Sequence, residues 1–188
     1  MNLNVKPFLL YKLLNSLFTG ISIGILFTIY TPLDPSIYSL GGIILAASML
    51  LIARYYEQLL NIKSFYYISL MVELIMLLTI IIFIILKYSL VSALIIYALY
   101  QFTFIFGSYL VRAETIVAKD KALLSKIDVY KQVGYLLGLC LSFIFYKIIE
   151  DNFLISDTKT QIIFLNYILL ILQIIIISFL QVSFSSSE

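Results

Sequence analysis

Residues 66–86 read YYISLMVELIMLLTIIIFIIL, and this stretch decides the fold class. From Leu74 to Leu86 the run is apolar on every side apart from Thr79. A transmembrane β-strand alternates apolar and polar residues, so this run excludes a barrel strand. Within hydrocarbon the backbone finds no water to bond, and a helix satisfies its own N–H and C=O groups. We therefore predict a membrane-spanning α-helix here.

The rest of the chain repeats this character. Of its 188 residues, 63% are hydrophobic and 12% charged, whereas a soluble domain is about half apolar and about a quarter charged. Windows of about 20 residues, the length that crosses a bilayer core, predict six spans. They cover residues 8–30, 36–56, 66–86, 89–111, 130–149 and 161–182. The predicted fold class is all-α, a polytopic membrane helix bundle in a single domain over residues 1–188.

The distribution of basic residues predicts the orientation. One side of this topology collects Lys6, Lys12, Arg54, Lys63, Arg112, Lys119, Lys121, Lys126 and Lys131, whereas the other has Lys87, Lys147 and Lys159. Basic residues accumulate on the cytoplasmic side, so both termini are predicted to be cytoplasmic. We expect a multi-pass protein of an inner or plasma membrane, with the lipid bilayer as its surroundings. The net charge of +2 does not indicate a nucleic-acid partner.

The longest polar stretch is a predicted cytoplasmic loop over residues 112–129. It carries charges of both signs around apolar residues at helical spacing. Such a pattern is typical of an amphipathic helix that lies on the membrane surface.

The inventory of reactive residues argues against an enzyme. The sequence has no histidine and a single cysteine, Cys140, so the commonest metal ligand and general base are missing. It also has no phosphate loop, zinc signature or nucleophile elbow. We predict no catalytic residue, no metal and no cofactor.

Glu73 is the most informative single residue, because an ionised carboxylate inside a membrane helix is costly unless it is paired, hydrated or protonated. One interpretation is a carboxylate that couples transport to a proton or a cation. The other is a structural ion pair, for which Lys12 on the first span is the candidate partner. The sequence leaves both interpretations open.

Further polar residues recur at helical spacing within the spans. They can line a solute pathway or serve as interhelical hydrogen-bonding groups. The candidates for a substrate pathway are Asn15, Thr19, Gln101, Asn166 and Gln173. Arg112, Glu114, Asp128 and Lys131 are candidates for a charge network that latches one conformation, although a solvated loop in contact with lipid headgroups fits them equally well.

Small residues at four-residue spacing predict close helix packing. Gly20 and Gly24 form such a pair on the first span, and Gly134, Gly138 and Ser142 form a series on the fifth.

The order of these features resembles one six-helix half of the major facilitator superfamily (MFS), a family of secondary transporters. The resemblance rests on the polar first span with its glycines, the Pro-containing turn over 31–36, the segment 111–114 (VRAE) and the segment 131–138 (KQVGYLLG). The chain departs from the family between the second and third spans. The family's motif there is rich in Gly and contains Asp, whereas residues 54–63 read RYYEQLLNIK. No functional residue is carried across that loop.

The resemblance implies a small secondary transporter or transporter half that moves a small solute by alternating access. The family normally uses two such halves, so a homodimer is the expected assembly. A split into two sets of three spans is compatible with an internal repeat. The alternative is a non-transporting accessory or assembly subunit of a larger complex, whose polar faces are buried against a second membrane subunit.

Overall fold

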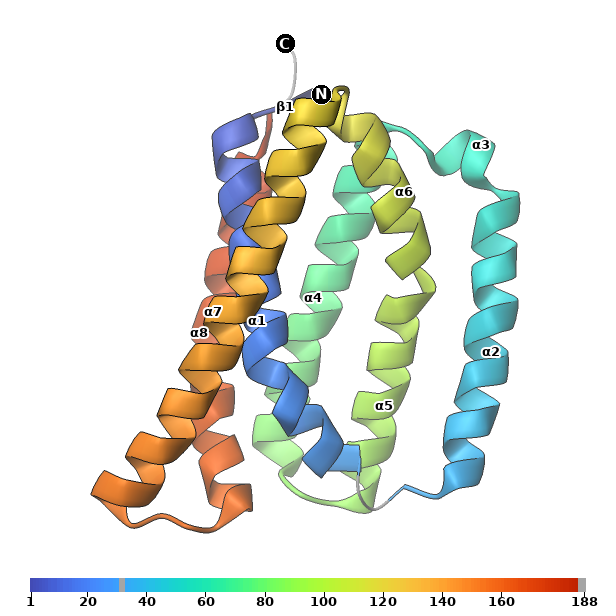
Figure 1. Ribbon diagram of the computed structural model, residues 1–188. Coiled ribbons are helices and arrows are strands. Elements are labelled where there is room, and N and C mark those ends of the chain that lie inside the picture. The colour runs from blue at the N-terminus through green and yellow to red at the C-terminus, as the bar shows by residue number, and fades with distance from the viewer. Residues whose placement is uncertain (31–32, 186–188) are drawn as a thin grey trace.

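The computed structural model describes residues 1–30 and 33–185, and nearly all of them are helical (Figure 1). The helices are α1 (Val5–Tyr30), α2 (Pro35–Arg54), α3 (Tyr56–Leu59), α4 (Ile62–Leu86), α5 (Leu90–Ile105), α6 (Gly107–Ala118), α7 (Lys121–Phe153) and α8 (Thr158–Val182). Among the described residues, six stretches are long and apolar enough to cross a membrane, with α5 and α6 forming one interrupted span. The predicted fold class, an all-α membrane helix bundle, is confirmed.

Side-chain caps fix where several helices begin. Asn61, Ser89, Asp120 and Asp157 each accept a hydrogen bond from the backbone N–H three residues further on. Such caps satisfy donors that the first helical turn leaves unpaired. The turn predicted over residues 31–36 connects α1 to α2, but Thr31 and Pro32 lie outside the described residues.

The structure differs from the surface helix predicted over residues 112–129. Helix α6 runs to Ala118, the chain turns at Lys119 with φ 62°, and α7 starts at Lys121. Val117 and Ile127 are 3% and 0% exposed. Because these apolar side chains pack against neighbouring helices, the segment extends two spans instead of lying on lipid.

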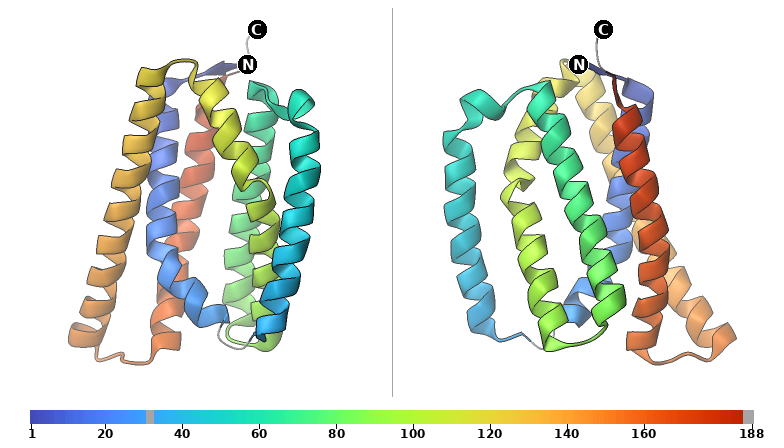
Figure 2. Two further views of the ribbon diagram at one scale, coloured as in Figure 1. Left: turned by 45° about the vertical axis from the view of Figure 1, so that its right-hand side comes forward. Right: turned by 180° about the vertical axis from the view of Figure 1, so that it is seen from behind.

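The contacts between helices follow a similar order in the two halves of the chain. In this comparison α1, α2 and α4 correspond to α5–α6, α7 and α8. Helix α1 packs on α7 and α8, and in the same way α5 packs on α2 and α4, while α4 packs on α8. The α6–α7 contact has no such counterpart. Since α1 and α5 run in opposite directions (Figures 1 and 2), this order of contacts is the one expected of an inverted repeat, although α1 packs far more extensively on α7 than α5 packs on α2.

The α1–α7 contact is the most extensive in the bundle, and glycines make it possible. A Cβ atom at Gly134 or Gly138 would collide with the carbonyl oxygen of Leu13 or Leu17, and one at Gly20 would collide with α7. Gly24, which was predicted to pack closely together with Gly20, does not do so, because a Cβ atom at Gly24 would meet nothing within 4 Å. The backbones thus approach closely at three glycines and not at Gly24.

Both ends of the described chain meet at one end of the bundle, called the terminal end below (Figure 1). Strand β1 (Asn2–Leu3) pairs antiparallel with β2 (Phe184–Ser185). The Phe184 ring lies within 6.0 Å of the rings of Phe8 and Phe65. This strand pair and its aromatic contacts hold the start of α1 next to the end of α8.

Candidate functional site

The Glu73 carboxylate lies at the centre of a buried hydrogen-bond cluster. Tyr11 and Asn15 from α1 donate to Oε1 at 2.8 and 2.7 Å. Gln173 from α8 donates through Nε2 to Oε2 at 2.8 Å and to the Glu73 backbone carbonyl at 2.9 Å. Glu73 and Gln173 are 2% and 1% exposed. We call Tyr11, Asn15, Glu73 and Gln173 the Glu73 cluster.

The geometry of this cluster suits an ionised carboxylate, since both oxygens accept from neutral donors. The hydrogen bonds stabilise a charge that would otherwise be very costly at this depth. They also tie α1, α4 and α8 together near the middle of the bundle.

The proposed Glu73–Lys12 ion pair is not formed. Lys12 pairs with Glu114 on α6, and Glu114 also accepts from Lys131 of α7 at 3.1 Å. Tyr11 and Lys12 are adjacent in α1, so their side chains point about 100° apart around the helix axis. That rotation directs Tyr11 toward α4 and Lys12 toward α6.

A second cluster, the charge cluster, consists of Lys12, Glu114, Lys131 and Asp128. The Glu114 side chain is 4% exposed and that of Lys12 12%, whereas Asp128 is 62% exposed and lies 3.7 Å from Lys131. The structure thus unites three of the four predicted latch residues. Arg112, the fourth, is exposed and lies in a shallow depression with Gly107 and Thr115.

The two clusters are neighbours. The Lys12 ammonium lies 5.3 Å from the centroid of the Tyr11 ring and 5.5 Å from that of Phe65. Both lysines pair with Glu114, and the aromatic rings beside the Lys12 ammonium lower the cost of burying that ion pair.

The other pathway candidates do not join these clusters. Thr19 is exposed and its hydroxyl bonds to the Asn15 carbonyl of its own helix at 3.1 Å. Asn166 is buried and donates to the Ile162 carbonyl one turn earlier at 2.8 Å. It lines an interior cavity of about 20 Å³, enough for about one water molecule. Gln101 lies in an apolar groove between α2 and α5.

Sequence reasoning missed Tyr11 as a member of the site. The signal was present, because Tyr11 and Asn15 are four residues apart and share a helical face. Tyrosine is common at membrane boundaries, so its presence in a span does not by itself indicate a buried partner for a carboxylate. The choice of Glu73 as the residue that needs partners does hold in the structure.

Chemically, the Glu73 cluster can hold a negative charge and fix three helices, and its titratable groups are the Glu73 carboxyl and the Tyr11 phenol. Comparison with protein-family models, with curated proteins and with solved structures gave no match.

Proposed function

We propose that this membrane protein is one half of an MFS-like secondary transporter, which forms a pathway for a small solute together with a second six-helix bundle. The observation that carries the proposal is the order of helix contacts, in which α1 contacts α7 and α8 as the antiparallel α5 contacts α2 and α4, the order expected of an inverted repeat. Inverted repeats are common in secondary transporters, whose substrate sites lie at repeat interfaces.

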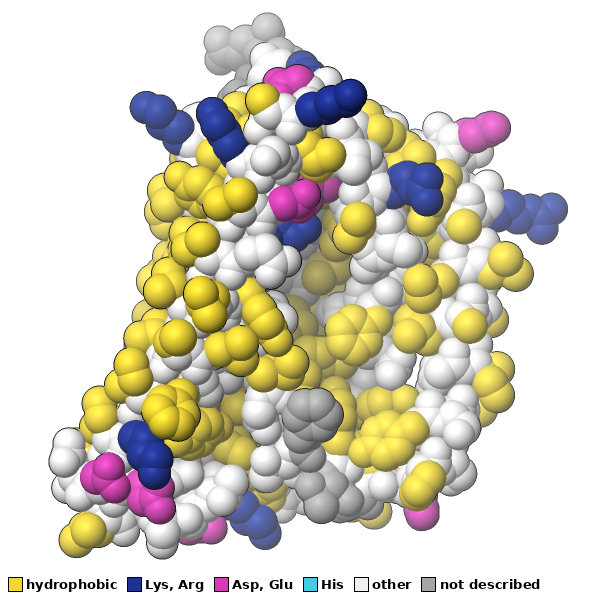
Figure 3. All heavy atoms as spheres, viewed as in Figure 1, with side chains coloured by type: hydrophobic (Ala, Val, Ile, Leu, Met, Phe, Trp, Pro, Cys, Tyr) yellow, Lys and Arg dark blue, Asp and Glu magenta, His cyan; other side chains and the backbone are white. Residues whose placement is uncertain are grey.

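One face of the bundle is the natural surface for the second half. In Figure 1 the helices α7, α1, α5 and α2 form this face, with α4 and α8 behind them. Figure 3 shows a hollow in it, with acidic and basic side chains gathered toward the terminal end. Helix α2 has no buried residue, and much of α7 outside its contact with α1 is exposed. A second bundle placed against this face would enclose the hollow.

The clusters support movement of this bundle as a rigid unit. The Glu73 cluster joins α1, α4 and α8, and the charge cluster joins α1, α6 and α7. Alternating access proceeds largely by rocking of one rigid bundle against another. The interior cavity near Asn166, about 20 Å³, is too small for a solute, which favours a pathway between two bundles over one within this chain.

The terminal end is the cytoplasmic side in this proposal. Arg54 and Lys63 flank α3 there, and Lys119, Lys121 and Lys126 lie at the turn from α6 to α7. These residues belong to the basic set that the positive-inside rule assigns to the cytoplasm.

Within this function Glu73 has two possible roles, and one variant separates them. Glu73→Gln keeps the shape but turns an N–H toward one of the donors. If Glu73 has only a structural role, the free energy of unfolding of the variant should fall by about 1–3 kcal/mol, the cost of one buried unsatisfied group. Any transport by the variant should then still respond to a proton gradient. A coupling carboxylate predicts transport that no longer responds to the gradient. Uptake into proteoliposomes with and without a pH gradient distinguishes these results, and fully unchanged transport would exclude the coupling role.

The assembly is the first experiment. The mass of the detergent-solubilised particle, corrected for bound detergent, is measured together with the identity of every polypeptide in it. A homodimer, or a pair with another six-span chain, supports the two-halves transporter. A lone monomer contradicts it.

A second candidate function is a non-transporting subunit of a membrane complex. The hydrogen bonding of the Glu73 carboxylate favours it, because both carboxylate oxygens are engaged by protein donors. Copurification with a complex of unrelated membrane polypeptides, in place of a second six-span bundle, would support this function.

A further inference from the structure

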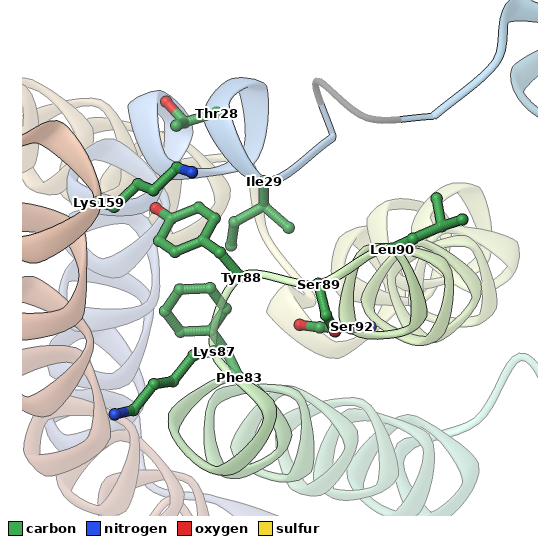
Figure 4. Close-up of a pocket in the computed structure, with 9 residues that line it drawn as sticks. All are labelled: Thr28, Ile29, Phe83, Lys87, Tyr88, Ser89, Leu90, Ser92 and Lys159. Atoms are coloured by element: carbon green, nitrogen blue, oxygen red, sulfur yellow. Dashed lines mark hydrogen bonds between the residues drawn. The ribbon is translucent and has the colours of Figure 1, made fainter.

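A pocket of about 470 Å³ opens at the end of the bundle opposite the termini. Helix α1 contributes Thr28 and Ile29, the α4–α5 turn contributes Lys87, Tyr88 and Ser89, and α8 contributes Lys159 (Figure 4). None of these residues belongs to the Glu73 cluster or the charge cluster. The pocket is therefore a separate feature of the fold.

The walls of this pocket are mainly apolar and aromatic. Phe83 and Tyr88 form an edge-to-face pair with centroids 5.2 Å apart, and Ile29 and Leu90 complete the lining. A mainly apolar pocket with a few polar groups is the usual form of a small-molecule site.

Two lysines flank the aromatic pair. Lys159 reaches from α8 toward Thr28 with its ammonium 5.7 Å from the centroid of the Tyr88 ring, and Lys87 extends along the other side (Figure 4). Among residues 1–30 and 33–185, the ion pairs formed include neither lysine. Both ammonium groups are thus available to an anion.

Two hydroxyl groups in the lining also lack a partner. The hydroxyl oxygens of Tyr88 and Ser92 are buried and form no hydrogen bond within the part of the chain that the structure describes. Ser92 as a whole is 0% exposed. The Tyr88 hydroxyl lies next to the Lys159 ammonium (Figure 4) and can donate to an anion's oxygen there. Ser92 also lies in the first turn of α5, where the helix dipole favours negative charge.

The backbone of the turn is strained at Lys87, where φ is 49° and ψ is −144°. A residue with a Cβ atom rarely adopts this conformation, and such strain gathers at functional sites. A glycine would fit this backbone better, so the lysine carries a conformational cost here.

One acidic residue lies close to the site. Asp157 caps α8 by accepting from the backbone and hydroxyl of Thr160 at 3.0 and 2.6 Å. These hydrogen bonds, with a smaller contribution from Lys159, hold the pKa of Asp157 below its usual value. The two lysines and this carboxylate leave a local charge of +1.

We propose that this pocket binds an anionic amphiphile, in which a phosphate group meets Lys159 beside the Tyr88 hydroxyl, Lys87 on the other side of the aromatic pair adds positive charge, and an apolar part packs against Phe83, Tyr88 and Leu90. The phosphate belongs either to a lipid headgroup at the membrane surface or to a soluble phosphate compound. The pocket's place at the end of the spans puts both sources within reach. The inference does not depend on the transport function.

Native mass spectrometry of the detergent-solubilised protein tests the lipid source. Equal amounts of phosphatidylglycerol and phosphatidylcholine with identical acyl chains are offered, and the bound lipid is counted. We expect about a tenfold preference for phosphatidylglycerol, since each lysine near a lipid surface contributes severalfold in affinity. The double variant Lys87→Gln/Lys159→Gln should lose it.

Lys147→Gln is the matched control. Lys147 belongs to the same end of the bundle, but it pairs with Glu150 at 3.6 Å and lies outside the pocket lining. Its variant should keep the preference. If the double variant does not fold, Lys159→Gln alone and Lys87→Gly, which suits the strained turn, replace it.

A second arm tests the soluble source with inorganic phosphate. A phosphate-dependent rise in thermal stability that the double variant lacks, with no lipid preference, supports the same site with a soluble ligand. The proposal is overturned if the wild type shows neither effect, if the double variant keeps them, or if Lys147→Gln removes them equally.

Discussion

Alanine at Gly134 or Gly138 should destabilise the bundle, although alanine is the better helix former. A Cβ atom at Gly134 would lie 3.0 Å from the Leu13 carbonyl carbon, and one at Gly138 would lie 3.0 Å from the Gly20 Cα atom. Ordinary carbon–carbon contacts are about 3.5–4.0 Å. Helices α1 and α7 would therefore have to separate by a sizeable fraction of an ångström.

The magnitude follows from two opposing effects. Overpacking costs about 1–3 kcal/mol, whereas replacing glycine by alanine within a helix gains about 1 kcal/mol. Each variant should thus lose up to about 2 kcal/mol in free energy of unfolding. Gly24→Ala is the control on α1, because nothing lies within 4 Å of its Cβ position, and it should be neutral or more stable.

Equilibrium unfolding in mixed micelles of dodecylmaltoside and sodium dodecyl sulfate measures these changes. The near-ultraviolet circular dichroism of the 15 tyrosines reports tertiary packing. If Gly134→Ala and Gly138→Ala prove as stable as Gly24→Ala, the close α1–α7 contact does not exist as described.

Three further predictions concern the two ends of the bundle. Glu114→Gln leaves its two lysine partners without a buried counter-ion and should cost about 3–5 kcal/mol, and the same unfolding assay should show a smaller loss when Lys12 is also replaced by Met. Phe184→Ala removes a ring that is 7% exposed and should lower the free energy of unfolding by about 3 kcal/mol. It should also speed deuterium exchange at the Asn4 amide, which donates to the Ser183 carbonyl at 2.8 Å. Unchanged exchange would mean that the strand pair does not depend on this ring. Because hydrogen bonding lowers the pKa of Asp157, its ionised cap stabilises α8 above the usual aspartate pKa of about 3.9 and loses this effect as the pH falls through the lowered value. The stability difference between wild type and Asp157→Ala should therefore be constant from neutral pH down to mildly acidic pH and shrink only in stronger acid, and a difference that does not depend on pH would refute the role of the ionised cap.

The sequence by itself determined that the chain is surrounded by lipid and that its spans are helices. A run such as Leu74 to Leu86 has no polar face, so only a helix in hydrocarbon accommodates it. The same local reasoning identified Glu73 as a residue that must find partners, because the cost of a buried charge does not depend on which helix is next to it.

The tertiary structure decided which partners those are. Tyr11, Asn15 and Gln173 reach Glu73 from positions 62, 58 and 100 residues away in the sequence. Hydropathy gives the length of each span but not its rotation or its depth relative to its neighbours. A rotation of about 100° between adjacent residues is enough to send Lys12 to Glu114 and leave Glu73 to neutral donors. Hydropathy also did not indicate the turn at Lys119. It made Gly24 look equivalent to Gly20, because the sequence does not show where two helix axes cross and hence where their backbones approach closely.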